Sequence, residues 1–370
     1  MFMALGAMLT AAVAAPDEDA VPRLAAAERV VAVAGGGYFP VLIQLRDGRL
    51  AAVVRGGAPH LGKAGRLDWI ESRDGGRSWS EPRAIIDSAW DDRNPAIGQM
   101  RNGTVVVAYA ECSCYNEKGD WDPKAGGFRL FYALSKDGGE TWSAKRPLTA
   151  GPIGRVGSPY GRIVVPRDGT ALMSVYGEAD PSYEGPGKPP VGSKGDMVGI
   201  LRSTDNGETW GDFSLISASD HNETALLPLS DGRILAAMRT GTGQVDVCES
   251  VDRGRTWSQP AAVTGGPDRK WPEHPADLVA LSRDRVLMLT GRRHAPMGAM
   301  ALVSKDRGRS WDYAGRRLVG WTSQNSDCGY PSAVRLRDGT VVCMYYSVGT
   351  AERPGVQQAI AVRLRDRDLP

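Results

Sequence analysis

The hydrophobic residues of this chain form short apolar runs that come in pairs around tight turns. The unit of apolar run, two-residue turn and second apolar run occurs six times, with the turns at Asp47-Gly48, Asn102-Gly103, Asp168-Gly169, Asp231-Gly232, Asp284-Arg285 and Asp338-Gly339. Asn-Gly and Asp-Gly between strand-like runs are the strongest short signal for a β-hairpin. Helical periodicity is absent, so the pattern predicts an all-β fold made of six hairpins.

A second repeat follows each of the first five hairpins. It has the pattern Ser-x-Asp-x-Gly-x-(Ser/Thr)-Trp, and its copies are Ser72–Trp79, Ser135–Trp142, Ser203–Trp210, Ser250–Trp257 and Ser304–Trp311. The chemistry fits a tight turn, since the aspartate can accept hydrogen bonds from turn amides and the glycine can adopt positive φ. The tryptophan supplies an apolar anchor beneath the turn. We therefore expect these aspartates to be structural, and not acids or metal ligands.

Together the two repeats predict a single six-bladed β-propeller of four-stranded antiparallel blades over residues 24–370. The sixth hairpin is followed by one apolar run, Gln357–Leu364, so its blade lacks a strand. The run Arg29–Val33 precedes the first hairpin and belongs to no other blade. We expect this N-terminal strand to complete the sixth blade and close the ring, which removes an exposed sheet edge.

Charge and composition narrow the possible partners. The net charge is +2 and no long basic run occurs, so nucleic acid is not an expected partner. The five cysteines include no Cys-x-x-Cys spacing, and no other cluster has metal-ligand spacing, so we predict no metal and no cofactor. We expect mostly free or buried thiols, with at most one disulfide.

The first residues of the chain are typical of an export signal. They are apolar and end in Val13-Ala14-Ala15 before Pro16, which predicts a signal peptide over residues 1–15. The positive segment that usually opens such a peptide is missing, which leaves a disordered or buried N-terminus as the alternative. No other stretch is long enough to span a membrane. The signal peptide predicts a secreted or periplasmic protein.

The hairpins also predict which residues meet at their open ends. Residues equally far from the turn lie at the same end of an antiparallel hairpin, and these ends ring the central mouth if the first strand is innermost. Counting from each turn glycine, or from Arg285, gives the pairs Phe39 and Arg55, Asn94 and Ala110, Tyr160 and Tyr176, Glu223 and Arg239, Ala276 and Arg292, and Tyr330 and Tyr346. The adjacent positions add Tyr38, Arg93, His274, Arg293 and Glu111. Converging arginines suit a carboxylate or sulfate ligand, although each arginine could instead be a solvated strand end or pair with a local aspartate.

The repeated turn resembles the Asp box, or BNR repeat, of the sialidase superfamily of β-propellers. The stretch Asn222–Leu235, followed by Arg239, is similar to the sialidase segment that carries the catalytic glutamate and an arginine of the substrate-binding triad. The stretch Gly329–Ser332 is similar to the segment that carries the nucleophilic tyrosine. The resemblance covers nearly the whole mature chain for the fold, but only the last three blades for catalysis.

The resemblance implies a role for each of these residues. Tyr330 would be the nucleophile and Glu223 the base that takes its proton, since a phenol is a poor nucleophile at its ordinary pKa. Arg239 with Arg292 or Arg293 would hold the carboxylate of the substrate. Sialidases use a tyrosine where most glycosidases use a carboxylate, and a carboxylate would repel the anionic substrate.

The chain departs from the sialidase pattern in its first blade. Sialidases usually begin with Phe/Tyr-Arg-Ile-Pro, whose arginine belongs to the triad, but this chain has Gly37–Pro40 there, with Tyr38 in place of the arginine. Arg55 and Arg93 are the candidates to compensate.

Two further departures concern carboxylates. The loop after the first hairpin, residues 56–66, lacks the acid that usually donates the proton, and its candidate donor is His60, with Asp68 farther along the chain. Tyr346 replaces the carboxylate that usually supports the third arginine.

We therefore expect an exported exo-glycosidase, similar to an exo-α-sialidase, that cleaves a terminal acidic sugar with Tyr330, Glu223 and His60 as catalytic residues. The expected substrate-binding residues are Arg239, Arg292, Arg293, Arg55, Arg93, Asn94, Tyr38, Tyr346 and His274. One alternative is a propeller glycosidase or lyase for another sugar, such as a uronate or a rhamnose-containing glycan, with His60 or His274 as acid/base. The other is a non-catalytic carbohydrate-binding propeller. In each case the partner is a glycan or glycoconjugate.

Overall fold

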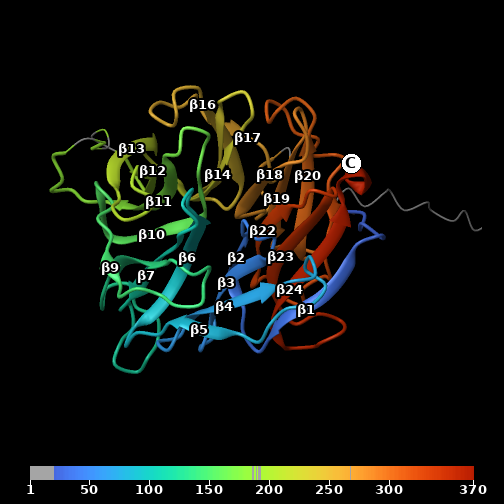
Figure 1. The fold of residues 1–370 in the computed structure, drawn as a ribbon, viewed down its shortest axis with the longest axis horizontal. Coiled ribbons are helices and arrows are strands. Elements are labelled where there is room, and N and C mark those ends of the chain that lie inside the picture. Colours follow the sequence, from blue (N-terminus) through green and yellow to red (C-terminus); the bar gives the residue numbers. More distant parts are fainter. Residues whose placement is uncertain (1–20, 186, 189, 191–192, 267) are drawn as a thin grey trace, which may run out of the picture.

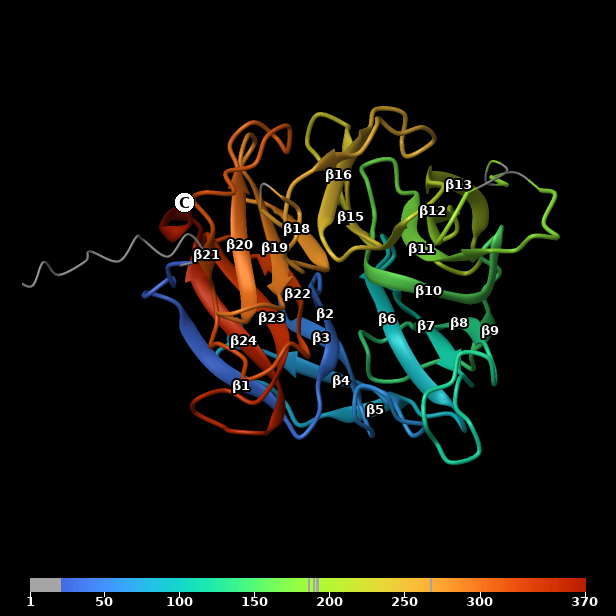
Figure 2. The same ribbon diagram turned by 180° about the vertical axis from the view of Figure 1, so that it is seen from behind.

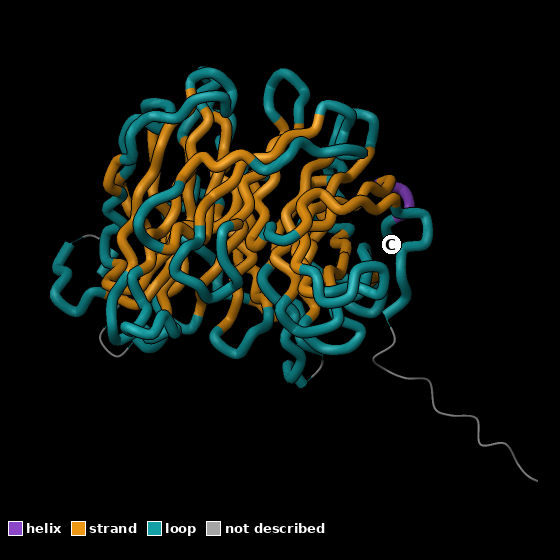
Figure 3. The backbone as a smooth tube through the Cα atoms, turned by 90° about the horizontal axis from the view of Figure 1, so that it is seen from below, coloured by secondary structure: helices purple, strands orange, loops and turns teal. Residues whose placement is uncertain are grey.

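The computed structural model describes residues 21–185, 187–188, 190, 193–266 and 268–370. The predicted signal peptide over residues 1–15 lies outside the described residues. Regular structure in the described part of the chain is almost entirely β-strand, with one short 3₁₀ helix, η1 (Asp366–Asp368). Figure 3 shows strands filling the middle of the molecule and loops lying on its opposite faces. No helix in these residues is long and apolar enough to cross a membrane.

The strands form four four-stranded sheets and one eight-stranded sheet. The first sheet consists of β2 (Tyr38–Gln44), β3 (Leu50–Gly56), β4 (Arg66–Ser72) and β5 (Arg83–Ile86). The third sheet along the chain consists of β14 (His221–Pro228), β15 (Ile234–Thr240), β16 (Val245–Ser250) and β17 (Ala261–Ala262). The fourth consists of β18 (Ala276–Ala280), β19 (Val286–Arg292), β20 (Gly298–Ser304) and β21 (Arg317–Leu318). The last consists of β22 (Cys328–Arg335), β23 (Thr340–Val348), β24 (Gln357–Arg365) and β1 (Glu28–Ala34).

The eight-stranded sheet contains two antiparallel meanders. The first consists of β6 (Asp91–Gln99), β7 (Val105–Cys112), β8 (Phe128–Ser135) and β9 (Arg146–Pro147). The second consists of β10 (Ile153–Val164), β11 (Ala171–Ala179), β12 (Asp196–Ser203) and β13 (Gly211–Ser217). A short parallel pairing between β6 and β10 joins them, with Ala96 opposite Gly161 and Ile97 opposite Arg162.

The sheets are arranged around the middle of the molecule, as Figures 1 and 2 show from opposite sides. Strand β2 contacts β6, and the contacts continue through β10, β14, β18 and β22 back to β2, so the first strands of the meanders enclose the centre. Strand β1 pairs antiparallel with β24 and becomes the outer strand of the last sheet. The structure thus confirms an all-β, propeller-like fold in which the N-terminal strand completes the last sheet.

The hydrophobic core lies between neighbouring sheets. One cluster packs Leu287 and Leu289 of β19 against Ala333 of β22 and Val341 of β23. Because the middle strands are covered on both faces, β7 and β19 are buried at every position. This explains why the strands read as continuous apolar runs instead of alternating apolar and polar residues. The five cysteines are all buried, and no disulfide joins them within the described residues.

The repeated Ser-x-Asp turns are structural, as predicted. In the turn of residues 135–142, Thr141 N donates to Asp137 Oδ1 at 2.9 Å, and Gly139 N donates to Ser135 Oγ at 2.8 Å. The hydrogen bonds from the side chain and backbone of Thr141, and from the hydroxyl of Ser135, hold the pKa of Asp137 below its usual value. The carboxylate therefore acts as an acceptor that closes the turn.

Candidate active site

Three inner strands contain a residue with positive φ directly before a proline. Phe39 in β2, Asn94 in β6 and Tyr330 in β22 each have a φ of 51°. The pairing register shifts at the same place in all three strands, which marks a β-bulge. Such a conformation costs a non-glycine residue roughly 1–3 kcal/mol, and strain of this kind clusters at functional sites. The three bulges are therefore a common device of this fold.

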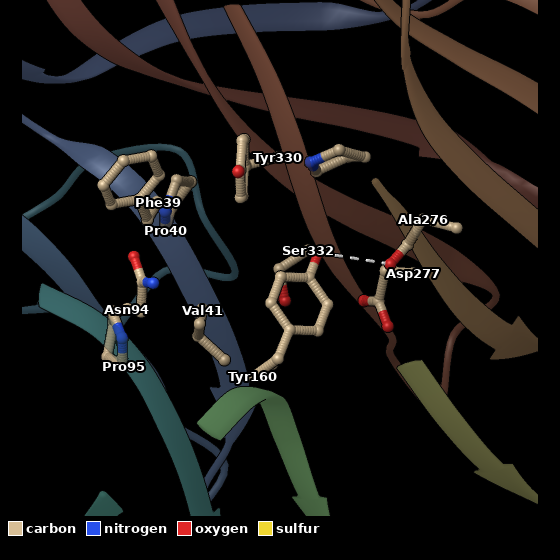
Figure 4. Close-up of a pocket in the computed structure, with 12 residues that line it drawn as sticks. Phe39, Pro40, Val41, Asn94, Pro95, Tyr160, Ala276, Asp277, Tyr330 and Ser332 are labelled. Carbon is tan, nitrogen blue, oxygen red and sulfur yellow. Dashed lines mark hydrogen bonds between the residues drawn. The ribbon is translucent and has the colours of Figure 1, made fainter. Parts of the chain in front are cut away.

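A small pocket lies at the centre, among β2, β6, β10, β18 and β22. Figure 4 shows Phe39, Asn94, Tyr160 and Tyr330 around this space. Tyr160 Oη donates a hydrogen bond of 3.4 Å to the carbonyl oxygen of Ala276, which ties β10 to β18. An aromatic wall with a few polar groups is typical of a ligand pocket.

Tyr330 of β22 and Glu223 of β14 meet at this centre. Tyr330 Oη donates a hydrogen bond to Glu223 Oε1, and Arg239 Nη1 of β15 donates to Glu223 Oε2 at 2.8 Å. Tyr330 and Arg239 are partly buried, and Glu223 is buried. The structure thus brings together the three residues that the hairpin register and the sialidase resemblance selected.

The surroundings set the charges of these groups. Burial, and then the Glu223 carboxylate, raise the pKa of Tyr330, so the phenol is protonated at neutral pH. Burial would lower the pKa of Arg239, but the Glu223 carboxylate outweighs it and the pKa is raised. Burial, with Arg239 and Arg293 nearby, lowers the pKa of His274 to about 2. His274 is therefore neutral, and its Nδ1 has no hydrogen-bond partner among the described residues.

Arg293 also lies against Tyr330. Its guanidinium carbon is 5.4 Å from the centroid of the Tyr330 ring, and its Nη2 donates to Tyr346 Oη at 3.4 Å. Tyr346 Oη in turn donates to Asp327 Oδ1 at 2.7 Å. Arg239 and Arg293 therefore place two positive charges beside Tyr330, which suits an anionic ligand.

The loop between β3 and β4 brings His60 to the same cluster. His60 Nδ1 lies 2.6 Å from Asp327 Oδ1. The His60 ring packs edge-on against Phe39 and beside Tyr38, with centroids 5.0 and 5.6 Å apart. The Phe39 ring is itself 4.8 Å from that of Tyr330. His60 and Tyr38 therefore lie in the aromatic cluster that includes Phe39 and Tyr330.

The first strand of the eight-stranded sheet contributes Arg93 and Asn94. The guanidinium carbon of Arg93 is 5.7 Å from the Phe39 ring, and Nη1 donates to Asp91 Oδ2 at 3.1 Å. Arg93 Nε is buried without a hydrogen-bond partner among the described residues. Asn94 lines the pocket and donates from Nδ2 to Tyr176 Oη at 3.2 Å. Of the two candidates for the missing arginine of the first blade, Arg93 is thus the one near the centre.

Arg55 was the other candidate, and its predicted role in substrate binding is wrong. Its side chain is fully buried, and Nε donates to Asp91 Oδ1 at 2.8 Å. The remaining nitrogens donate to the carbonyl oxygens of Pro59 at 2.7 Å and Gly62 at 3.0 Å. Arg55 therefore anchors the loop that carries His60 and is not available to a ligand.

Arg292 is a second error, and its cause is the register of one hairpin. Its side chain is fully buried and donates to Glu273 Oε1 at 3.4 Å and to carbonyl oxygens of the following loop. The β18–β19 turn lacks glycine, and Ala276 pairs with Thr290, so counting from Arg285 was one residue off. A shift of one residue exchanges the two faces of a strand. The next residue, Arg293, lies against Tyr330 instead.

Three acidic residues complete the comparison with the sequence. Asp68, the other acid named for the first blade, is buried and accepts a hydrogen bond from Arg66 Nε at 2.8 Å. Asp327 was missed, although it precedes Tyr330 by three positions, because its partner His60 lies on a distant loop. Asp196 was missed because it begins the third strand of its meander. Burial raises the pKa of Asp196, and the nearby carboxylates of Glu178 and Glu223 raise it further, although a hydrogen bond from Asn222 acts in the opposite direction.

The described residues contain no group of three or more His, Cys, Asp or Glu side chains that could hold a metal ion.

Comparison with known families agrees with this geometry. A model of the BNR repeat-like domain matches residues 90–343, more than half of the chain. The chain belongs to the BNR repeat-like domain family. The family model and the sialidase relative below support the resemblance to the sialidase superfamily that the repeated turns indicated.

The similar proteins are distant in sequence. A sialidase of Paraclostridium sordellii is 23% identical over 210 residues, which cover 50% of this BNR-repeat chain and 48% of the sialidase. The chain therefore spans about half the length of that relative.

Solved structures share the fold of this BNR-repeat chain. A protein of unknown function from Dyadobacter fermentans DSM 18053 has a TM-score of 0.73 at 22% identity, and the match covers 91% of this chain and 98% of that one. The intramolecular trans-sialidase from Ruminococcus gnavus has a TM-score of 0.67 at 13% identity, covering 90% and 95%.

Proposed function

We propose that this protein is an exported exo-glycosidase that releases a terminal acidic, sialic-acid-like sugar, with Tyr330 as nucleophile and Glu223 as its base. The observation that carries the proposal is the hydrogen bond from Tyr330 Oη to Glu223, with Arg239 on the other carboxylate oxygen. A purely structural tyrosine would not need a buried carboxylate at its hydroxyl beside a strained backbone and two arginines.

The chemistry follows from the charges. Because burial and Glu223 keep Tyr330 protonated, its oxygen can attack a sugar only while Glu223 removes the proton. Arg239 and Arg293 bind the carboxylate of the sugar and offset the negative charge of Glu223. A neutral tyrosine nucleophile avoids a second carboxylate next to an anionic substrate, and two successive displacements at the anomeric carbon retain its configuration.

We further propose that the fold is a six-bladed propeller. Support comes from the eight-stranded sheet, whose two meanders are joined at two residue pairs only, and from the closed ring of contacts among the six inner strands. Each meander then counts as one blade. Export to the periplasm or the cell exterior remains a prediction from residues 1–15.

One observation favours a second substrate class. Arg55 is locked in a buried ion pair and Tyr38 replaces the first-blade arginine, so Arg239 and Arg293 are the main cations at Tyr330. Two arginines can hold a single carboxylate, and a uronate, like a sialic acid, carries one. The second candidate is therefore a propeller glycosidase for such a sugar.

The experiment is a release assay with 4-methylumbelliferyl glycosides of N-acetylneuraminic acid and of glucuronic acid. We expect turnover of the first by the wild type and a loss of at least about 1,000-fold in the Tyr330→Phe variant, which lacks the nucleophilic oxygen. Equal turnover by that variant would rule out covalent catalysis through Tyr330. Binding of both free sugars without turnover would support the non-catalytic carbohydrate-binding alternative.

A further inference from the structure

Cleavage of a glycosidic bond leaves an oxygen that must receive a proton. Glu223 cannot supply it in the first step, because it takes the proton of Tyr330. His274 is also unsuited, since a pKa of about 2 leaves it without a proton to give at neutral pH. Asp277 in the central pocket is fully engaged, because its two oxygens accept hydrogen bonds of 2.8 Å from two backbone amides. The proton donor must therefore come from elsewhere around Tyr330.

His60 and Asp327 form a pair with the required geometry. Since Asp327 Oδ1 accepts at 2.6 Å from His60 Nδ1, a protonated imidazole directs its second proton outward from Nε2. Nε2 makes no hydrogen bond within the described residues. Burial would raise the pKa of Asp327, but the bond from His60, helped by Tyr346 and Arg293, outweighs it and keeps the carboxylate ionised. The side chains are 29% and 31% exposed, so the pair is open to an incoming ligand.

The pair is also held at a fixed place relative to the nucleophile. Asp327 lies three residues before Tyr330, and the His60 ring is separated from the Tyr330 ring by Phe39. On the loop side, Arg55 donates to the carbonyl oxygens immediately before His60 and two residues after it. The buried Arg55 therefore restricts the loop on both sides of the imidazole.

We infer that His60 donates the proton to the leaving oxygen and that Asp327 is the positioning residue that orients its imidazole. The inference rests on the proposed glycosidase function. In the first step Tyr330 Oη bonds to the anomeric carbon, its proton passes to Glu223, the glycosidic C–O bond breaks, and the leaving oxygen takes the proton of His60 Nε2. In the second step His60 takes a proton from water, the water oxygen displaces Tyr330 from the anomeric carbon, and Glu223 returns the proton to Tyr330. The net reaction is the addition of water across the glycosidic bond.

The test compares two leaving groups on one sugar. The first substrate is 4-methylumbelliferyl α-N-acetylneuraminic acid, whose aryl leaving group departs with little help from a proton donor. The second is 3′-sialyllactose, whose leaving sugar oxygen must be protonated as the bond breaks. We expect His60→Gln to lower kcat on sialyllactose about 100-fold or more and on the aryl glycoside less than about 10-fold. Asp327→Asn is also expected to lower kcat more on sialyllactose than on the aryl glycoside. Both losses should be smaller than in His60→Gln, because the imidazole remains but is less well oriented.

The control is His221→Gln, which removes the other Asp-paired histidine, whose Nε2 is 3.2 Å from Asp246. This variant is expected to leave the ratio of the two activities unchanged. If His60→Gln loses the same factor of activity on both substrates, the inference is overturned. It is also overturned if Asp196→Asn, and not His60→Gln, selectively loses sialyllactose cleavage. Retention of activity by Tyr330→Phe overturns the proposed function, whereas its loss together with an unselective His60 variant overturns only the proton donor.

Discussion

The hairpins β2–β3 and β14–β15 each place an arginine at the same distance from the turn, yet the two arginines have opposite roles. Arg55 of β3 is completely buried, donates to Asp91 and holds a loop. Arg239 of β15 is 27% exposed, shares Glu223 with Tyr330, and has a buried Nε without a partner among the described residues. Equal register therefore places the two side chains alike, but the partners differ.

The difference lies in the carboxylate that each arginine meets. Asp91 is fully buried and also accepts hydrogen bonds from Tyr115 and Arg93, so the charge of Arg55 is neutralised inside the protein. Glu223 instead meets Tyr330, which lines the pocket, and the charge of Glu223 is divided between an arginine and this phenol. An arginine is available to a ligand only if its counter-charge belongs to the site.

The largest effect should come from breaking the buried pair. Arg55→Met leaves Asp91 as a buried charge without its main partner, and we expect the free energy of unfolding to fall by about 3–5 kcal/mol. Urea denaturation at neutral pH measures this. The double variant Arg55→Met with Asp91→Leu should recover most of the loss. A fall below about 1 kcal/mol in the single variant would show that Arg55 is not the anchor.

The next effect should be on activity alone. Arg239→Gln removes a cation beside the nucleophile while Glu223 keeps an amide donor, so kcat/KM is expected to fall about 100-fold to 1,000-fold with little change in unfolding free energy. Steady-state kinetics on the aryl glycoside checks this. Arg255→Gln, at a half-exposed arginine paired with Asp212, serves as the control and should retain full activity. If Arg239→Gln lowers the free energy of unfolding as much as Arg55→Met does, Arg239 is also a structural anchor and the two arginines do not differ in role.

The smallest effect concerns pH. His274 beside Arg239 has a pKa of about 2 when folded, whereas an unfolded histidine takes up its proton below about pH 6.5. The neutral imidazole therefore contributes stability above pH 6.5 that is lost as the pH falls. The free energy of unfolding should fall between pH 7 and pH 4.5 in both proteins. We expect this fall to be about 2 kcal/mol smaller in His274→Gln than in the wild type. Urea titrations at both pH values measure this, and identical losses would show that His274 is protonated in the folded protein.

Much of the fold could be predicted because its signals are local. Asp-Gly turns, apolar runs and the Ser-x-Asp turns act within a few residues, and these predicted the hairpins and the place of the N-terminal strand. At the turn without glycine, Asp284-Arg285, the count from the turn misjudged Arg292. Bulges shift the pairing in other hairpins as well, so that Arg55 lies opposite Tyr38 and Tyr346 opposite Gly329. The three X-Pro bulges carried a visible signal that the hairpin count did not use.

Local pattern in the chain was thus enough to place Tyr330, Glu223 and Arg239 at one centre, because hairpin geometry converts distance from a turn into position along a strand. Which arginine is anchored and which is available depends on carboxylates from other segments. The pairing of His60 with Asp327 joins positions 267 residues apart. Packing of the closed ring decides such contacts, because the free energy of a buried charge depends on the partner that the fold brings to it.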